Sequence, residues 1–331
     1  LSIVECSGDI ANPTFKVIDW VLNSQASLHA EYGGVFPALA KREHLKNLPI
    51  LLEQIMQKHD PKSIDAIAVT NGPGLEPALW TGIVFAKELG EKWNVPVIPT
   101  NHMEGHIISP LIHSAEPIEF PALALLISGG HTELVKINSW GSYEILGETV
   151  DDAVGEAFDK VARILGLPYP GGPEISHKAS ISRTKRTEST FNFPRPMLHS
   201  KDFNFSFSGL KTSVLYTVQK IENLTEEIIE DIAHGFEDTV TEVLIKKTCK
   251  AIEEIGANTL IIGGGVVSNT HIRDSFEKTC KEKHVNLLLS DKSVATDNAV
   301  MIAAAGYISF IKNPKIYDQK TDFKAEGNLK L

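Results

Sequence analysis

The spacing of hydrophobic residues changes along the chain between a helical and a strand-like period, which predicts a mixed α/β protein. Apolar residues recur every three to four positions over 37–58 and 225–255, as on one face of an amphipathic helix. Short apolar runs are typical of buried strands. Strands are therefore expected at 1–6, 15–22, 64–69, 95–98, 121–127, 133–137, 259–262 and 285–289, and helices at 37–58, 78–93, 151–165, 225–255 and 299–311.

Glycine-rich segments follow several of these elements. They lie at 71–74, 129–130, 171–172 and 263–265. A glycine loop between a strand and a helix can present backbone amides to an anion, or let the backbone approach a ligand closely. The first loop lacks the Lys-Ser/Thr ending of a P-loop, so a plain structural turn is an equal alternative there.

Some boundaries carry more specific expectations. Pro49 is expected to kink or divide the helix over 37–58. Thr296 is a candidate N-cap for the helix over 299–311, which would place Asp297 in the first turn, where the helix dipole favours an acid. The segments 31–35 and 168–173 are expected to be loops, and the polar tail from 313 onward is expected to be loosely held.

Two histidines stand four residues apart where the run 95–100 leads into an expected helix. His102 and His106 then lie on one helical face, so both imidazoles can reach one metal ion. H-E-x-x-H metalloproteases share this spacing, but here Glu104 points about 200° around the helix from His102. That placement is poor for a protease base. Paired histidines also occur as ordinary core or surface residues, so a metal site needs a third ligand.

Composition and charge narrow the class of protein. The chain has 331 residues, 42% hydrophobic and 22% charged, which suits a substantial core and about two domains. It contains no run of about 18 apolar residues, as a membrane span needs, and no leader is apparent, so a cytoplasmic location is expected. The net charge of -10 argues against a protein that coats nucleic acid by bulk electrostatics. Cys6, Cys249 and Cys280 are too few and too scattered for a disulfide framework or a thiolate metal cage.

One segment departs from this acidic average. Between 177 and 211 the regular periodicity fades and basic residues outnumber acidic ones. This segment is the best candidate for a surface that faces a polyanion, and a solvated segment that happens to be basic is an equal alternative. Its basic residues are Lys178, Arg183, Lys185, Arg186, Arg195, Lys201 and Lys211.

Six blocks of sequence, in order along most of the chain, resemble the TsaD family of tRNA N6-adenosine threonylcarbamoyltransferases, formerly labelled sialoglycoproteases. They are NGPGL (71–75), NHMEGH (101–106), LLISGGHTELV (125–135), GEAFDKVARILGLPYPGGP (155–173), FSFSGLKT (205–212) and TDNAVMIAAAG (296–306). The resemblance implies an α/β, actin-like ATPase fold of the sugar kinase and heat-shock chaperone type (ASKHA), with two lobes around a central cleft. The expected N-terminal lobe is 1–115, completed by 296–331, and the expected C-terminal lobe is 116–295.

The same resemblance implies a metal site and a substrate site. One divalent metal, iron(II) with zinc(II) as the alternative, is held by His102, His106 and Asp297. Two imidazoles and one carboxylate leave coordination positions open for substrate. By its spacing alone Asp159 would lie on a solvated helix face, and no residue stands out as a general base. Substrate-binding positions carry over to Leu126, Ile127, Ser128, Gly129, Gly130, Asp159, Gly172 and Asn269.

The implied reaction transfers a threonylcarbamoyl group from threonylcarbamoyl-AMP to the exocyclic N6 of the adenosine 3′ to the anticodon, in tRNAs that read codons beginning with A. The expected ligand is this adenylate or an adenine nucleotide. The implied partners are tRNA, a TsaB-like paralogue and a TsaE-like ATPase, with the adenylate supplied by a TsaC-like enzyme and no membrane partner. A metalloprotease is one alternative. An ATPase or sugar kinase of the same fold is another, although the sequence offers no clear catalytic aspartate for it.

Two departures from the family pattern stand out. The family opens with a strand and an acidic turn, whereas 1–5 already resembles its second strand. The first strand and its loop are therefore expected upstream of Leu1. Ala295 stands where the family commonly has a cysteine, and this difference is not expected to affect the metal.

Overall fold

The computed structural model describes residues 1–25, 28–29, 36–114, 118–292, 294–317 and 322–331. The chain forms two compact units. Unit 1 comprises Leu1–Pro117, Trp140–Ser142 and Asp297–Leu331, and unit 2 comprises Ile118–Ser139 and Tyr143–Thr296. The loop expected at 31–35 lies outside the described residues. Among the helices described, none is long and apolar enough to cross a membrane.

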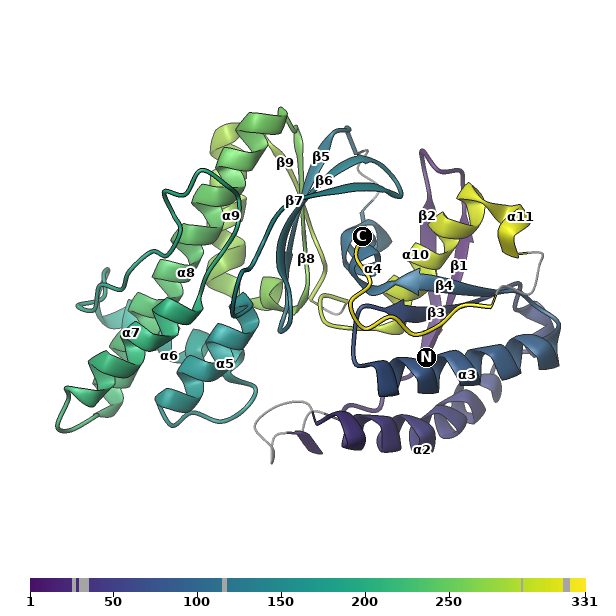
Figure 1. Cartoon of the computed structure of the whole chain (residues 1–331), viewed down its shortest axis with the longest axis horizontal. Coiled ribbons are helices and arrows are strands. Elements are labelled where there is room, and N and C mark those ends of the chain that lie inside the picture. Colours follow the sequence, from purple (N-terminus) through teal and green to yellow (C-terminus); the bar gives the residue numbers. More distant parts are fainter. Residues whose placement is uncertain (26–27, 30–35, 115–117, 293, 318–321) are drawn as a thin grey trace. The chain divides into compact units, whose positions relative to one another are not determined.

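Unit 1 is built on two pairs of strands (Figure 1). β1 (Ser2–Ser7) and β2 (Thr14–Trp20) are antiparallel, which confirms the two strands expected at 1–6 and 15–22. β3 (Ile67–Gly72) and β4 (Val97–Asn101) are parallel, and α3 (Glu76–Trp93) connects them. β3 lies further along the chain than the expected strand and includes Gly72, so the first glycine loop is shorter than the sequence suggests.

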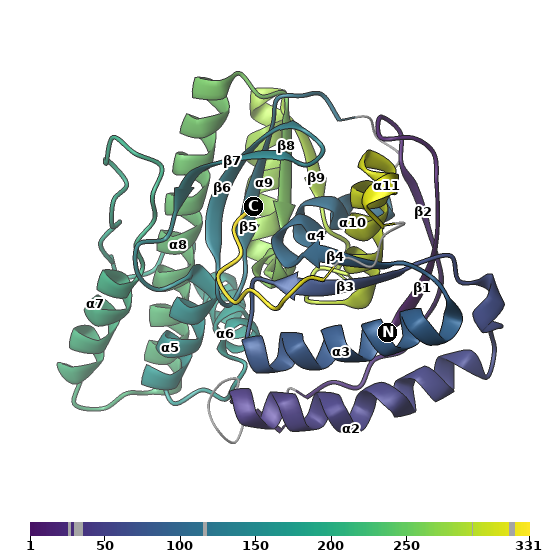
Figure 2. The same cartoon turned by 45° about the vertical axis from the view of Figure 1, so that its right-hand side comes forward.

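Helices cover these strands (Figure 2). α2 (Pro37–Met56) packs against α3 and continues through Pro49, so the helix is not divided there, while a kink at Pro49 stays a prediction. α4 (His102–Ile108) follows β4 directly. α10 (Ala299–Lys312) packs against β1, β3, β4 and α4, which makes a C-terminal helix part of this unit's core. Short helical turns lie at η1 (Pro61–Ser63), η2 (Ser109–Ile112) and α11 (Pro314–Tyr317).

The C-terminal tail is held against unit 1, so the expectation of a loosely held tail is wrong for residues 322–331. The amide of Glu326 donates to the carbonyl of Asn71 at 2.8 Å, and the amide of Gly74 donates to the carbonyl of Gly327 at 3.0 Å. The second contact uses an amide of the first glycine loop. It favours the structural-turn alternative for that loop over an anion site.

Unit 2 contains a five-stranded sheet in the order β7-β6-β5-β8-β9. β5 (Ala122–Ile127) and β6 (Thr132–Ser139) form an antiparallel hairpin from the strands expected at 121–127 and 133–137. All six residues of β5 are buried, as its apolar run predicts for a central strand. β8 (Thr259–Gly263) is parallel to β5, and β9 (Asn286–Leu289) is parallel to β8. β7 (Ser142–Glu148) was not predicted, because an edge strand carries few apolar residues.

Helices pack on both this sheet and one another (Figure 1). α8 (Glu226–Ile255) contacts β5 and β6, and α9 (Thr270–Lys283) contacts β9. α5 (Val154–Ile164) packs against α6 (Gly171–Lys185), which in turn packs along α8. The remaining helical segments of the unit are α7 (Ser208–Gln219) and the short η3 (Gly265–Ser268).

The sequence left most of α6 unassigned. The loop expected over 168–173 is wrong for 171–173, because α6 begins at Gly171 and Gly172 lies in its first turn. The helix buries Gly171, Ile175, Ala179 and Ser182, which follow helical spacing but include only one large apolar side chain. Hydrophobic periodicity therefore gave no signal here, although the element is helical.

Candidate metal centre

The junction between β4 and α4 fixes the two histidines. Asn101 ends the strand and caps the helix, because its Oδ1 accepts hydrogen bonds from the amides of Met103 (2.8 Å) and Glu104 (3.3 Å). The four-residue spacing places His102 and His106 on one face, with their ring centroids 4.7 Å apart. The predicted change from strand to helix at this stretch is confirmed.

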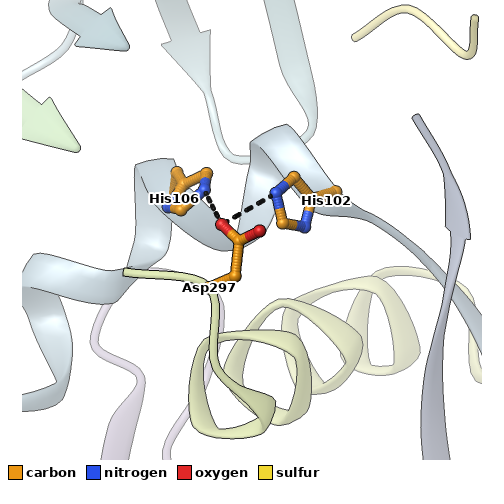
Figure 3. A group of neighbouring side chains, drawn as sticks. All are labelled: His102, His106 and Asp297. Atoms are coloured by element: carbon orange, nitrogen blue, oxygen red, sulfur yellow. Dashed lines mark hydrogen bonds and ion pairs between the residues drawn. The ribbon is translucent and has the colours of Figure 1, made fainter. Parts of the chain in front are cut away.

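Asp297 brings a carboxylate to the same point (Figure 3). Its Oδ1 lies 3.3 Å from Nε2 of His102 and 3.2 Å from Nε2 of His106. Asn298 caps α10, since its side chain accepts a backbone amide of the first turn at 2.9 Å. The expected cap at Thr296 is therefore wrong, and Asp297 precedes the helix instead of lying in its first turn.

A glycine lets α4 and α10 approach closely enough for this meeting. A Cβ atom on Gly105 would lie 3.1 Å from the side chain of Ile302 and 3.2 Å from that of Met301, tighter than an ordinary van der Waals contact. The glycine of the His-Met-Glu-Gly-His run therefore serves the packing that brings the aspartate to the histidines.

The separations among the three groups suit a single metal ion. The candidate ligand atoms of His102, His106 and Asp297 all lie within 4.8 Å of one another. Metal bonds to imidazole nitrogen and carboxylate oxygen are about 2.0–2.2 Å long, so two ligand atoms on one ion are about 3.0–3.5 Å apart. Both distances to Asp297 fall in that range. Two imidazoles and one carboxylate suit iron or zinc and leave positions open.

Burial of His106 adds a reason for a strong bond at its Nε2. The residue is completely buried, and its Nδ1 has no hydrogen-bond partner among the residues that the structure describes. An unsatisfied buried polar atom costs about 1–3 kcal/mol. Ligation of the other ring nitrogen, which faces Asp297, offsets such a cost.

The two imidazoles also favour the charged form of Asp297. Desolvation by itself raises the pKa of this carboxyl, but hydrogen bonds from His102 and His106 outweigh it and hold the pKa well below its usual range. An ionised carboxylate is the form that binds a divalent ion.

The residues predicted to bind substrate all lie in unit 2, and most belong to the tip of the β5–β6 hairpin. The side chains of Leu126 and Ile127 are buried in β5, so these residues offer only backbone atoms to a ligand. Ser128 closes the tip, because its Oγ accepts the amide of His131 at 3.1 Å. A Cβ atom at Gly129 or at Gly130 would meet no atom within 4 Å, which leaves space beside the tip.

The glycine loop after β8 lies directly beside the end of β5. Leu126 pairs with Gly263 across the parallel strands. Gly264 has a φ of +96°, and a Cβ there would lie 2.4 Å from the carbonyl oxygen of Ile127, so only glycine fits. The carboxyl ends of two parallel strands therefore present their glycine loops at one edge of the sheet, a common place for ligands in α/β folds.

Asp159 and Gly172 meet at the start of α6. The Oδ1 of Asp159, on α5, accepts the amide of Gly171 at 2.7 Å. Burial raises the pKa of this carboxyl, while the amides of Gly171 and Gly172 oppose the rise. Asp159 is thus a half-buried anchor for a helix start and not a solvated face residue. A Cβ at Gly172 would meet no atom within 4 Å.

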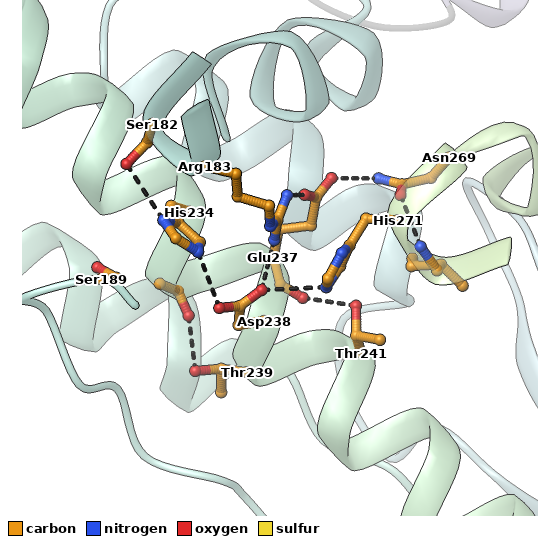
Figure 4. A network of polar contacts seen from close by, with 12 residues as sticks. Ser182, Arg183, Ser189, His234, Glu237, Asp238, Thr239, Thr241, Asn269 and His271 are labelled. Carbon is orange, nitrogen blue, oxygen red and sulfur yellow. Dashed lines mark hydrogen bonds and ion pairs between the residues drawn. The ribbon is translucent and has the colours of Figure 1, made fainter. Parts of the chain in front are cut away.

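Asn269 is fixed by two hydrogen bonds at the start of α9 (Figure 4). Its Oδ1 accepts the amide of Ile272 at 3.0 Å, and its Nδ2 donates to Glu237 at 2.5 Å. Glu237 is fully buried on α8 and pairs with Arg183 of α6, which also pairs with Asp238. The network ties α6, α8 and α9 together. The sequence did not reveal it, because acids on a long helix are usually solvated.

Most cations of the basic segment expected to face a polyanion form ion pairs within unit 2, which reduces the charge available to a polyanion; the contact itself stays a prediction. These cations pair with acids that α8 presents at helical spacing, a pattern that the sequence does contain. These pairs are Lys178 with Glu226, Arg183 with Glu237 and Asp238, Lys185 with Glu230, Arg186 with Glu227 and Asp231, and Arg195 with Glu242.

One part of the network has the composition of a hydrolase triad. Ser182 Oγ lies 3.1 Å from Nδ1 of His234, whose Nε2 lies 3.1 Å from Asp238 (Figure 4). Ser182 and His234 are both buried, so a substrate cannot reach the hydroxyl as a nucleophile must be reached. Desolvation also lowers the pKa of His234. The group is structural.

Comparison with sequences of known proteins gives a consistent answer. The TsaD family model, described as tRNA N6-adenosine threonylcarbamoyltransferase, matches residues 16–304. A protein of that name from Thermosipho africanus (strain TCF52B) is 45% identical over 320 residues, which are 96% of this chain and 94% of that protein. One from Paraburkholderia xenovorans (strain LB400) is 46% identical over 297 residues, or 88% and 85% of the two chains.

Solved structures agree on the fold. HypF from T. kodakarensis has a TM-score of 0.57 at 13% identity, over 81% of this chain and 43% of that one. A full-length HypF in its phosphate- and nucleotide-bound form has a TM-score of 0.57 at 15% identity, over 81% and 50%. The predicted class, an α/β protein with an actin-like ATPase fold, is confirmed. From the family match and the shared length, this chain belongs to the TsaD family, the tRNA N6-adenosine threonylcarbamoyltransferases.

Proposed function

We propose that this protein transfers a threonylcarbamoyl group from threonylcarbamoyl-AMP to the exocyclic N6 of the adenosine 3′ to the anticodon, in tRNAs that read codons beginning with A. The observation that carries the proposal is identity of 45% over 96% of the chain to a relative of that name. The meeting of His102, His106 and Asp297 supports it, because Asp297 is far from the two histidines in sequence and none of the three has a hydrophobic role.

One divalent ion, iron(II) or zinc(II), is the cofactor in this proposal, held by His102, His106 and Asp297. Support comes from the donor set and from ligand separations that suit one ion. When bound, the ion supplies Lewis acidity to the threonylcarbamoyl group at its open coordination positions. The protein keeps Asp297 ionised and orients the Nε2 atoms of His102 and His106 toward one position beside that carboxylate.

The adenylate is assigned to residues 126–130, Asp159, Gly172 and Asn269 of unit 2. Space beside Gly129 and Gly130 supports the approach of a ligand to the hairpin backbone. The side chain of Asn269 is held in one orientation, because its Nδ2 donates to Glu237 and its Oδ1 accepts the amide of Ile272. Its amide group is therefore oriented before a ligand binds. Such fixed polar groups reduce the entropy lost on binding.

The proposed chemistry is substitution at the carbamoyl carbon of a mixed anhydride. A C–N bond forms to the adenosine amine, the C–O bond to phosphate breaks, AMP departs with the bonding electrons, and the amine loses a proton. An exocyclic aromatic amine is a weak nucleophile, so the protein must contribute through orientation and through stabilisation of charge on the anhydride and on the departing phosphate. No side chain is assigned as general base.

We assign tRNA as the macromolecular substrate and propose that a TsaB-like paralogue and a TsaE-like ATPase assist in the cytoplasm, with the adenylate made by a TsaC-like enzyme. The net charge of -10 and the pairing of the basic segment with α8 both support dependence on partners for tRNA binding. We also propose that the lobes are 1–115 with 296–331, and 116–295.

The test is complementation of cells depleted of their own transferase. Wild-type protein is expected to restore modified adenosine, measured by mass spectrometry of tRNA nucleosides, whereas His102→Ala and Asp297→Ala are expected not to. Lys283→Ala, at an exposed ion pair of unit 2, serves as the control. Failure of the wild type would overturn the function, and full modification by both variants would overturn the metal role. Peptide cleavage that requires Glu104, or phosphoryl transfer to a small molecule, would favour the alternatives.

A further inference from the structure

The last ten residues lie along unit 1 and change direction in a turn at Gly327 and Asn328, where the amide of Leu329 donates to the carbonyl of Glu326 at 3.2 Å. From 322 to 331 exposed and half-buried positions alternate strictly, so every second residue is partly covered by protein. Lys87 of α3 holds the beginning of the segment, because its Nζ donates to the carbonyl of Phe323 at 3.0 Å and lies 4.6 Å from the centre of that ring. The half-buried positions are Phe323, Ala325, Gly327, Leu329 and Leu331.

The middle of the segment is docked on the turn that follows β3. Backbone hydrogen bonds join Glu326 to Asn71 and Gly327 to Gly74. The approach is so close that a Cβ atom at Gly72 would lie 2.1 Å from the carbonyl oxygen of Glu326. Glycine at this position is therefore required by the tail.

The end of the segment reaches the residue that caps α4. Asn101 Nδ2 donates to the carbonyl of Lys330 at 3.2 Å, while Oδ1 of the same side chain accepts the amides of Met103 and Glu104. The carbonyl of Lys330 can only accept a hydrogen bond, so it must face the Nδ2 group of Asn101, and Oδ1 is then left to face the amides of α4. The tail carbonyl thus orients the cap, and His102 is the next residue.

We propose that residues 322–331 are a positioning strap for the metal-bearing helix: the strap holds Asn101 as the cap of α4 and thereby holds His102 toward Asp297. α4 has seven residues, too few for a stable isolated helix, so its orientation depends on its cap and its packing. Groups that orient metal ligands typically change metal affinity by 10–100-fold. The inference rests on the proposed metal site for its effect on affinity, but not for its effect on α4.

Three variants release the strap by different routes. Truncation after Ala325 removes the contacts of Glu326, Gly327 and Lys330, whereas Gly72→Ala leaves the tail sequence intact and fills its place. Asn101→Ser keeps a capping oxygen but is too short to reach the tail carbonyl. Each is expected to weaken the affinity for cobalt(II) or zinc(II) by about tenfold in direct titrations of the purified protein.

Two comparisons make the test specific. In the truncated chain Gly72→Ala is expected to have no further effect, because its Cβ then meets no tail; an additive loss would overturn the proposal. Gly82→Ala on α3, whose Cβ would make an ordinary 3.7 Å contact with Val69, is the matched control.

Amide exchange in metal-free protein separates the strap from the metal site. The peptide that covers 101–108 is expected to exchange faster in the three variants than in wild type and Gly82→Ala. Unchanged exchange would overturn the strap even where metal binds. If the wild-type protein binds neither ion, the proposed metal site fails, and the exchange result alone decides the strap.

Discussion

At the residue scale, the donors around each carboxylate decide whether it keeps its charge. Desolvation acts to raise the pKa of Asp151, Asp238 and Asp297, yet the pKa of each is lowered, because hydroxyl, guanidinium or imidazole groups donate to it. Asp159 receives only backbone amides and a nearby acid opposes them, so its pKa is raised. Exposure alone would not have separated these four residues.

Acid is expected to destabilise unit 2 through Asp238. Its pKa is lowered from 3.8 to about 2, because hydrogen bonds from His271 and Arg183 outweigh desolvation. A depressed folded-state pKa contributes stability that is complete above the ordinary pKa and lost as the pH falls from about 4 toward 2. After allowance for solvent screening, the loss is roughly 1 kcal/mol. Asp238→Asn is expected to flatten this part of the profile in urea unfolding, and identical profiles for wild type and variant would contradict the assignment.

The metal centre shows how far residue patterns lead. The spacing of His102 and His106 predicts a shared face from helical geometry alone. Thr296, Asp297 and Asn298 are all residue types that cap helices, so the pattern cannot choose among them. In the structure Asn298 is the cap, and the carboxylate of Asp297 instead contacts the imidazoles of His102 and His106. Sequence spacing does not predict this contact, and only the family resemblance suggested it.

At the scale of elements, the pattern of apolar residues was sufficient to predict β5 and α8. It did not predict α6, which is stabilised by ion pairs and by the packing of small residues. α6 is held by ion pairs to α8 and by a narrow face of small side chains. The tail could have been recognised, because apolar or small residues alternate with polar ones from 323 to 331. Because residues 322–331 belong to no sheet, this alternation is the one feature of their sequence that indicates a segment held against the protein.

Arg183→Ala is expected to lower the free energy of unfolding by about 2–4 kcal/mol, since it leaves the fully buried carboxylate of Glu237 without its cation. Lys283→Ala, which removes an exposed pair with Glu253, is expected to have little effect. Denaturant unfolding measures both. In a Glu237→Gln background the cost of Arg183→Ala is expected to shrink, because no buried charge remains. Equal costs for Arg183→Ala and Lys283→Ala would show that the buried pair contributes nothing.

At the scale of the whole molecule, the two sets of predicted site residues belong to different units. His102, His106 and Asp297 lie in unit 1, where α10 returns from the end of the chain to pack on β1, β3 and α4. The predicted substrate residues lie in unit 2, at the end of β5 and in the hairpin tip after it, on α5 and at the starts of α6 and α9. Periodicity predicted the α/β class, but a helix that crosses back to an N-terminal core has no signature in hydrophobic spacing. The family resemblance was needed for the fold.

This division predicts that metal and nucleotide protect different segments from amide exchange. Ligand binding stabilises the parts of a protein that contact it, by about 2.7 kcal/mol at a concentration 100 times the Kd. Zinc(II) is expected to protect 101–108 and 297–302 of unit 1, and AMP, the leaving group of the proposed reaction, is expected to protect 128–131, 171–175 and 264–272 of unit 2. Asp297→Asn is expected to abolish the first effect and keep the second. Protection by AMP confined to unit 1 would reject the substrate residues proposed in unit 2, whereas protection by zinc confined to unit 2 would reject the metal ligands.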